Sequence, residues 1–577
     1  MADTGLPAGR LARPLLTGRG GEHLLVALLA LYVLALGLWP LLRLFAEAFG
    51  ANDAGESFGL IRDGLSSRAT HRALGNTVYA SAGSVVVSAV LGVALALAVG
   101  MLRLRGRVAM TFLILAPLLI PSQIMALAWI ELMGSSSPIL GPLGLAPAPG
   151  QTNPMYSAGG IIALMGIEHM PLVFLAVRAA LAALPEDLVE AARIAGAGRG
   201  RILARVVLPL VAPAAASGAI LAFAAAVGNF GVAALLGIPG RFSMLTTLIY
   251  QRLNGFGPAV IGQVAVLALL LVALAGAALG LRALMVRRAV PVDRGGRALQ
   301  PLELGRWQLP VEAGLWALLL VMAVLPMLAL LGTALSPALG VPLTLETLTF
   351  ANFTDTLLNN AAIRRAFANS AWLSLAAAVV SAAVALGIGY MAAQRRHMLA
   401  RRLLWLTDAP FVVPGTVLAL AYILVFLPPL PVVGVSIYGT STILLLAYLA
   451  RFLPLVLGPA TVAMAGTEPA LDEAARIVGA GLLTRIGRIT APMAAPSLVA
   501  GAVLVFLTAF NELTLSALLW SSGVETVGVM VFSLQYEGNS TGAAALSAAS
   551  VGFVLALALA LDRLAGRLPP GTLPWRS

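Results

Sequence analysis

The 577-residue sequence contains no cysteine and no lysine, so all 36 of its basic residues are arginine. Without cysteine the chain can form no disulfide and offers no thiolate as a nucleophile or metal ligand. Without lysine it can have neither a phosphate-binding loop of the G-x-x-x-x-G-K type nor a Schiff-base amine. We therefore predict no catalytic residue in this chain. If it works with ATP, a separate subunit must bind the nucleotide.

Charged residues are also scarce, at 10% of the chain against 60% hydrophobic residues. Soluble proteins carry about 25% charged residues, so a water-facing surface over most of this chain is excluded. Apolar runs of about twenty residues recur, and each can cross roughly 30 Å of hydrocarbon as a helix. We predict an all-α polytopic membrane protein with twelve spans, near 24–42, 77–100, 108–131, 159–183, 211–236, 258–283, 313–335, 370–393, 403–427, 440–463, 495–520 and 541–563.

The arginines are distributed unevenly between alternate loops, which predicts the orientation in the membrane. The connections 132–158, 428–439 and 521–540 contain none, whereas arginines cluster in the loops on the other side. We therefore place both termini in the cytoplasm, and we find no cleavage site ahead of the first span. The net charge of +12 then reflects topology and contact with anionic lipid, and we expect no nucleic-acid partner.

The chain contains an internal repeat. Residues 190–214 align without gaps to 473–497 with 12 of 25 positions identical, and residues 116–130 align to 409–423 with 7 of 15 identical. Six spans per copy insert both copies in the same direction, which predicts two parallel repeats. We divide the chain into a first half at 1–286, a cytoplasmic linker at 287–310 that is rich in arginine, glycine and proline, and a second half at 311–577.

A patterned segment of nearly thirty residues joins the fourth and fifth spans of each half, at about 184–210 and 467–493. Acidic residues near its start favour a short helix, and Gly196, Gly198, Gly479 and Gly481 permit the positive φ that ends such a helix. A second helical stretch then returns to the membrane. The shared residues are Glu190, Ala191, Ala192 and Gly196 in the first copy and Glu473, Ala474, Ala475 and Gly479 in the second.

The spacing is E-A-A, three residues, glycine, nine residues, then a version of I-x-L-P. It resembles the motif of the permease subunits of ATP-binding-cassette (ABC) importers that are fed by binding proteins. Val206 replaces isoleucine and Ala491 replaces leucine in the two copies. The resemblance covers nearly the whole chain and implies a type I importer permease fold. In that family the segment forms a coupling helix that docks on the ATPase subunit. A short helix lying on anionic lipid is the alternative for a basic segment.

The resemblance also implies partners and a location. Glu190 and Glu473 would pair with a basic residue on each of two copies of an ABC ATPase, and Gly196 and Gly479 would form the turn. ATP and Mg²⁺ would be bound by those partner subunits, and this chain would bind no cofactor. A periplasmic solute-binding protein would deliver the solute to a permease in the bacterial inner (plasma) membrane. Because both halves lie in one polypeptide, this chain most resembles the permeases for ferric iron. Thiamine, aminophosphonate and polyamine are the alternative solutes.

A few polar residues lie within predicted spans, where a charge costs about 2.5–3.5 kcal/mol on insertion scales. The repeat places Glu168 and Arg451 at corresponding positions, so they could pair across the two halves. Alternatively, each faces its own half and bonds to a backbone carbonyl freed by the nearby proline. Asn229, Asn511 and Glu512 lie toward the outer end of the fifth spans. We assign these five residues to a translocation path, and no histidine pair has the spacing of a metal site.

Two other classes fit the hydropathy. A secondary transporter of the major-facilitator type also has two parallel six-helix halves, and would couple to an ion through a carboxylate such as Glu168 or Glu512. It does not explain the repeated segment, and neither does a membrane scaffold. Segments 241–253 and 526–537 are amphipathic, and we expect them to lie along the outer interface, where loops of the family touch the binding protein.

Overall fold

The computed structural model describes residues 19–52, 54–254, 260–288, 301–430 and 434–564. Within them the chain is helical, with one isolated bridge between Leu102 and Leu302. The first half contains α1 (Arg19–Tyr32), η1 (Val33–Leu38), α2 (Trp39–Ala48), α3 (Gly59–Ser66), α4 (Arg68–Met101), α5 (Arg107–Leu119), α6 (Ser122–Met133), α7 (Ala158–Ala182), α8 (Glu186–Ile194), α9 (Arg199–Ile202), η2 (Leu203–Val207), α10 (Leu208–Val227), η3 (Ala233–Gly237), α11 (Leu245–Leu253) and α12 (Val260–Arg288). The second contains η4 (Gly305–Trp307), α13 (Gln308–Leu319), η5 (Leu320–Val324), α14 (Leu325–Leu335), α15 (Ala351–Phe353), η6 (Thr354–Asn359), α16 (Ala361–Gly389), η7 (Tyr390–Gln394), α17 (Met398–Val412), α18 (Gly415–Phe426), α19 (Ser441–Ala465), α20 (Pro469–Ile477), α21 (Leu482–Arg485), η8 (Ile486–Thr490), α22 (Ala491–Phe510), α23 (Ser516–Leu519), α24 (Val527–Tyr536) and α25 (Ser540–Leu564).

The predicted spans are confirmed except for the third and fifth spans of each half. Ten helices in the described residues are long and apolar enough to cross a membrane. The third spans are instead broken, by 107° between α5 and α6 and by 102° between α17 and α18. Pro121 and Pro414 stand at the breaks, each preceding the second helix. A proline disfavours helical backbone in the residue before it and has no N–H to continue the ladder, so the helix stops there.

Prolines also shape the helices that remain continuous. Pro40 and Pro326, at corresponding positions of the two halves, follow the π-helical turns η1 and η5. Pro209 and Pro492 follow η2 and η8 in the same way. A proline cannot donate a hydrogen bond to the carbonyl oxygen four residues before it, and the wider π-helical turn makes room for that unbonded carbonyl. The repeat therefore extends to the irregular turns as well as to the helices.

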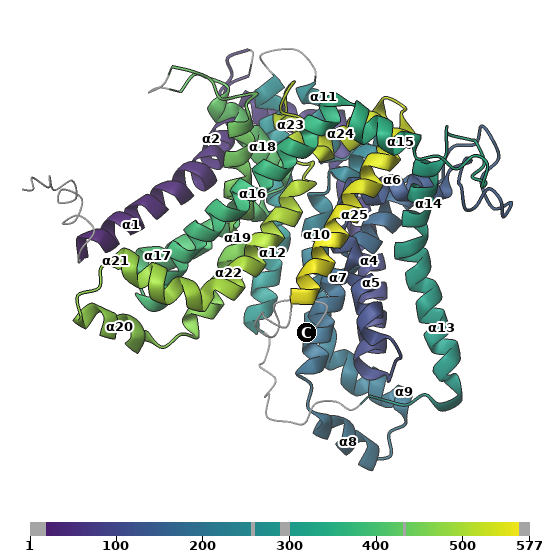
Figure 1. Cartoon of the computed structure of the whole chain (residues 1–577), viewed down its shortest axis with the longest axis horizontal. Coiled ribbons are helices and arrows are strands. Elements are labelled where there is room, and N and C mark those ends of the chain that lie inside the picture. The colour runs from purple at the N-terminus through teal and green to yellow at the C-terminus, as the bar shows by residue number, and fades with distance from the viewer. Residues whose placement is uncertain (1–18, 53, 255–259, 289–300, 431–433, 565–577) are drawn as a thin grey trace, which may run out of the picture.

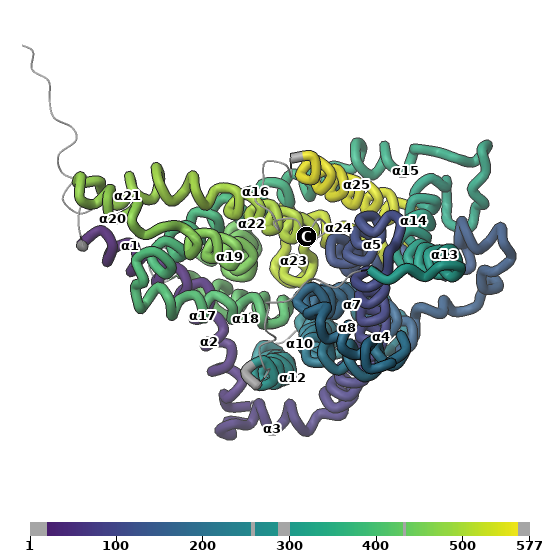
Figure 2. Tube along the Cα trace, turned by 90° about the horizontal axis from the view of Figure 1, so that it is seen from below, coloured from purple at the N-terminus to yellow at the C-terminus, as the bar shows by residue number. Residues whose placement is uncertain are grey.

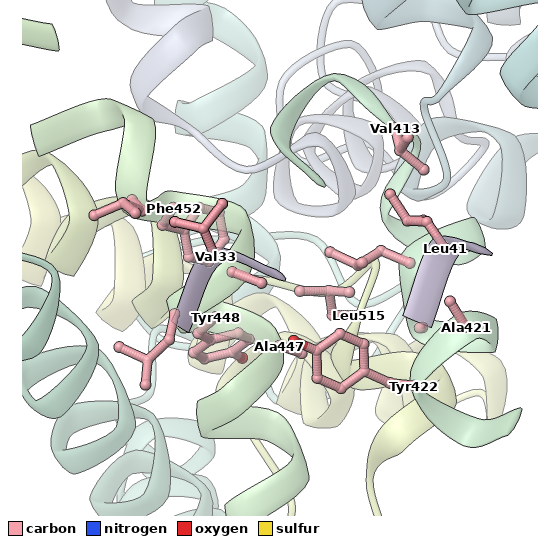
Figure 3. Close-up of a cluster of buried hydrophobic side chains, with 14 of the residues drawn as sticks. Val33, Leu41, Val413, Ala421, Tyr422, Ala447, Tyr448, Phe452 and Leu515 are labelled. Carbon is pink, nitrogen blue, oxygen red and sulfur yellow. The ribbon is translucent and has the colours of Figure 1, made fainter. Parts of the chain in front are cut away.

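The first helices are exchanged between the halves. The α1–η1 helix packs against α17 and α19 of the second half, and α13 packs against α5 of the first (Figure 2). Hydrogen bonds join the exchanged segment to its host, among them one from the Tyr32 hydroxyl to the Leu449 carbonyl oxygen and one from the Tyr422 hydroxyl to the Leu36 carbonyl oxygen, both at 2.8 Å. Figure 3 shows Val33 and Leu41 of the first half among the buried side chains of α18 and α19.

The fifth spans end earlier than predicted, at Val227 and Phe510 rather than near 236 and 520. Each is followed by a break, a short helical turn (η3 or α23) and a helix (α11 or α24). We expected the segments that form α11 and α24 to be amphipathic and to lie along the outer interface, and in the structure they are more buried than a helix on the membrane surface would be. Most of α24 is buried, as are Leu245 and Ile249 of α11, because both helices pack among membrane helices.

The helices converge at one end of the molecule and spread apart at the other (Figure 1). The short helices α8 and α20 lie apart at the open end, which we call the arm end; α11 and α24 lie at the converging end, which we call the far end. Of the predicted linker, residues 289–300 lie outside the described residues. The part that follows them pairs with the first half, through hydrogen bonds of Leu302 with Met101 and Arg103.

Candidate coupling arms and translocation path

The two repeated segments, 184–210 and 467–493, form matching projections that we call the coupling arms. Each begins with a short helix, α8 or α20, that ends where Gly196 and Gly479 adopt φ of +78° and +80°. Only glycine takes this left-handed conformation without strain, which explains the glycine in both motifs. Gly198 and Gly481, for which we expected the same conformation, have φ of −70° and −67° and instead precede α9 and α21.

The motif residues form the free face of each arm. Glu190 and Ala191 are exposed in α8, and Glu473 and Ala474 are exposed in α20. Ala192 and Ala475 are half-buried. Because the alanines are small, another protein could approach the backbone of both helices closely. The arms therefore present two similar surfaces at the same end of the molecule.

In the first half, the predicted path residues Glu168 and Asn229 lie together. Asn229 Nδ2 donates to Glu168 Oε2 at 2.9 Å, and the Ser122 hydroxyl donates to the other carboxylate oxygen. Asn229 Oδ1 accepts the backbone N–H of Val232 at 3.0 Å. Ser122 stands directly after Pro121, so this cluster connects α7, the break in the third span and the end of the fifth.

In the second half, Arg451 and Glu512 occupy the same places. Arg451 of α19 donates to the Val413 carbonyl oxygen at 3.1 Å, directly before Pro414. Glu512 accepts the backbone N–H of Ser516 at 3.0 Å and its hydroxyl at 3.1 Å, which caps the start of α23. The cluster again connects the fourth span, the broken third span and the end of the fifth.

The predicted pair between Glu168 and Arg451 does not form. No ion pair joins them within the described part of the chain, because each finds its partners in its own half. The alternative that each residue faces its own half is confirmed, but its bonding differs: Glu168 accepts from two side chains, and Arg451 donates to a carbonyl beside Pro414 of the third span rather than beside the proline of its own span. Ser122 was missed by the sequence reasoning, although its position after Pro121 in the aligned A-P-x-x-x-P segment was a signal for it.

Contacts between the halves close the far end. Gln123 of the first half donates to the backbone carbonyl oxygen of Asn511 in the second at 2.8 Å. The rings of Phe230 and Tyr250 meet Phe532 of the second half, with centroids 6.2 Å and 5.8 Å away. Burial raises the pKa of Tyr250, so its hydroxyl stays neutral. The side-chain amide of Asn511 is buried at this closure and has no hydrogen-bond partner among the described residues.

Comparison with known proteins agrees with this architecture. The family model of the binding-protein-dependent transport system inner membrane component matches twice, at residues 88–289 and 385–573. A probable ABC transporter permease protein of Sinorhizobium fredii is 27% identical over 551 residues, covering 94% of this chain and 95% of its own. A ferric transport system permease protein of Actinobacillus pleuropneumoniae is 22% identical over 519 residues, covering 86% and 72%.

Relatives for other solutes match over shorter stretches. The molybdenum transport system permease protein of Escherichia coli is 33% identical over 101 residues, which is 17% of this chain and 44% of its own. The double match of the family model supports an importer permease rather than a secondary transporter or a scaffold. The chain is a multi-pass inner-membrane protein with two fused halves, and it belongs to the family of binding-protein-dependent ABC transport permeases.

Proposed function

We propose that this chain forms the translocation path of an ATP-driven importer in the bacterial inner membrane. Two copies of an ABC ATPase subunit dock on the coupling arms and bind ATP and Mg²⁺, and a periplasmic binding protein delivers the solute to the far end. Both termini and the arm end then lie in the cytoplasm. The single observation that carries this proposal is the pair of similar exposed faces on α8 and α20 at one end of the molecule.

The cycle follows from the positions of the closure and the arms. In the described conformation the far end is closed by Phe230, Tyr250 and Phe532, while the arms stand apart. ATP binding would draw the two ATPase subunits and hence the arms together. The halves would then separate at the far end and admit the solute. The chain supplies the path and the gate, and hydrolysis takes place on the partner subunits.

Docking is tested by co-purification of the chain with an ABC ATPase subunit expressed together with it. Glu190→Lys combined with Glu473→Lys should release most of the ATPase, because each change reverses a charge on the docking face. The matched control is Glu346→Lys combined with Glu537→Lys, since both of these glutamates are exposed but lie outside the arms. Equal retention of the ATPase by both double variants would contradict the proposed docking.

We propose ferric iron as the solute, which rests on the likeness to ferric transport permeases at 22% and 23% identity over most of the chain. Thiamine, aminophosphonate and polyamine remain alternatives.

One structural observation favours a second class of solute, the oxyanions. The guanidinium group of Arg451 has five N–H donors. In the described structure one of them donates to the Val413 carbonyl oxygen. Its spare donors suit an anion, and molybdenum and sulfate permeases are among the partial relatives.

Uptake measurements separate these solutes. Cells that express the whole transporter should accumulate radioactive ferric iron faster than cells without this chain, whereas molybdate and sulfate uptake should be unchanged. The reverse pattern would identify an oxyanion transporter.

Asn511→Ala should lower uptake of the true solute without releasing the ATPase, because the unpaired amide of Asn511 lies at the closure through which the solute passes.

A further inference from the structure

Four charged side chains meet at the arm end of the second half, and we call them the ionic cluster. They are Glu22 of α1, Arg395 after η7, Asp472 of α20 and Arg485 of α21. Arg485 lies 2.9 Å from Asp472 and 3.0 Å from Glu22, measured between guanidinium nitrogen and carboxylate oxygen. Arg395 lies 3.2 Å from Glu22 and 3.6 Å from Asp472.

The centre of the ionic cluster is shielded from solvent. The side chains of Arg485 and Asp472 are only 4% and 6% exposed. Tyr390 completes it: its hydroxyl donates to Asp472 Oδ1 at 2.7 Å and accepts from Arg485 at 2.7 Å. Buried charges are tolerated only when they are paired and hydrogen-bonded. Here two carboxylates and two guanidinium groups balance one another in charge, although the Nε atoms of Arg395 and Arg485 have no hydrogen-bond partner among the described residues.

The first half has nothing comparable at the corresponding positions. The shift of 283 that aligns the arms places Val189 opposite Asp472 and Ile202 opposite Arg485. Both are buried, at 4% and 5% exposure, and belong to an apolar core cluster. Leu97, at the position that corresponds to Tyr390 in the second span, packs against the same cluster. Thus Val189 and Ile202 make apolar contacts at the positions where Asp472 and Arg485 form an ion pair.

The outward faces of the arms do not share this difference. Leu188 and Leu471 are 43% and 44% exposed, and Ile194 and Ile477 are 88% and 86% exposed. The asymmetry is therefore confined to the inner faces, where each arm contacts its own membrane helices. A partner would meet two similar surfaces but would pull on two different attachments.

The ionic cluster also crosses between the halves. Glu22 belongs to the first half, whereas Arg395, Asp472 and Arg485 belong to the second. This contact exists because α1 packs on the second half. A displacement of α20 is therefore opposed directly by charges on the first helix of the other half.

We propose that Asp472 and Arg485 are positioning residues that fix the second coupling arm to α1 through Glu22, so that α20 and α1 move as one unit, whereas the corresponding residues of the first arm, Val189 and Ile202, are apolar. Nonpolar contacts have no directional requirement and let helices slide. Paired and hydrogen-bonded charges hold a fixed geometry. This role rests on the proposed docking of an ATPase to both arms, but the attachment itself can be tested on the permease alone.

The absence of cysteine from the chain makes the test direct, because introduced cysteines can be spin-labelled without a background. Labels at Ile477→Cys on α20 and Leu31→Cys on α1, both exposed positions, report the distance between the two helices in the full-length protein in lipid nanodiscs. The test variant is Asp472→Val with Arg485→Ile, which installs the residues of the first half and leaves Glu22 and Arg395 paired. Replacing a buried ion pair by apolar residues is often tolerated by the fold.

The labelled protein should show a narrow distance distribution, and the double variant should broaden it at least twofold. The control is Arg476→Ile, which removes an exposed arginine of α20 that has no ion pair in the described structure, and it should leave the width unchanged. Labels at Ile194→Cys and Leu318→Cys, on α8 and α13, should give the same distribution with and without the double substitution.

An unchanged width between α20 and α1 in the double variant would overturn the proposal, whether or not the ATPase docks on the arms. If the double variant does not fold, Glu22→Gln is measured with the same labels, because it removes only the charge that comes from the other half. An unchanged width in that variant would overturn the proposal equally. Failure of the unsubstituted permease to bind an ABC ATPase would instead contradict the proposed docking, while a broadened distribution in the double variant would still support the attachment.

Discussion

At the scale of single residues, the two halves have polar side chains at the same positions, but the side chains differ in charge. Glu168 and Arg451 correspond under the repeat, as do Asn229 and Glu512. The first half therefore has an acid on the fourth span and an amide at the end of the fifth, whereas the second has a base and an acid. The bonds that Glu168, Arg451 and Glu512 make in the described structure all lie within their own half. This is why the charges do not need each other across the interface.

The Tyr422 hydroxyl is one of the groups that hold the exchanged first helix in place. Pro40 has no N–H for the Leu36 carbonyl, and Tyr422 of the second half donates to that carbonyl at 2.8 Å. Tyr422→Phe should therefore lower stability by about 1 kcal/mol, the usual net value of a buried hydrogen bond. The thermal unfolding midpoint in detergent should fall by about 1–2 °C. Tyr438→Phe, at an exposed tyrosine, is the control, and equal midpoints for both variants would contradict the assignment.

At the scale of helices, glycines set how closely the fourth and fifth spans pack. A Cβ at Gly218 would lie 2.8 Å from the Val173 Cα atom, and one at Gly501 would lie 2.7 Å from the Val456 Cα atom. These two contacts correspond under the shift of 283. Lipid is as apolar as leucine, so helices in a membrane associate through such close approaches. The same crossing is thus built twice, from the same residue types.

Gly501→Ala should force α22 away from α19, because the backbone of α19 cannot yield as a side chain could. Overpacking of this kind costs about 1–3 kcal/mol. Gly458→Ala is the control, since a Cβ there meets nothing within 4 Å and alanine favours the helix. Thermal unfolding of the purified variants distinguishes them, and a destabilised Gly458→Ala with an unaffected Gly501→Ala would contradict the packing.

At the scale of the whole molecule, closure at the far end and separation at the arm end belong to one conformation. Phe230, Tyr250 and Phe532 bring both halves together at the far end. Aromatic pairs contribute about 0.5–1.5 kcal/mol each beyond their buried area. Two pairs cross between the halves, so their loss is enough to shift the balance between closed and open states about tenfold or more.

Phe532→Ala should therefore favour opening at the far end. Spin labels at Gln251→Cys on α11 and Glu537→Cys after α24, both exposed, should show longer and broader distances in this variant than in the cysteine-labelled parent. Phe411→Ala removes an exposed ring of α17 and should leave the distances unchanged. Unaltered distances in Phe532→Ala would show that the rings do not hold the closure.

The exchange of first helices predicts that the halves hold together without a covalent connection. Separately expressed chains of residues 1–294 and 295–577 should co-purify, because α1 packs on the second half and α13 on the first. A first chain that begins at residue 49 lacks α1 and α2 and should recover far less of the second chain. Equal recovery with and without residues 1–48 would contradict the importance of the exchange.

The sequence by itself determined the spans, the two parallel halves and the coupling arms. Each of these depends on local signals, namely twenty-residue apolar runs, a repeated motif and a glycine that permits positive φ. Pro121 and Pro414 were visible in the aligned segments, but whether such prolines kink a span or break it by about 100° depends on what surrounds the freed backbone groups.

Only the tertiary structure decided which half holds α1, why Glu168 does not meet Arg451, and how Glu22 reaches Arg485. The apolar surface of a membrane helix does not specify which helix packs against it, because lipid tails and apolar side chains are equally hydrophobic. The choice of partner falls to a few glycines, hydroxyls and charges scattered along the chain, and they become neighbours only after the helices have packed.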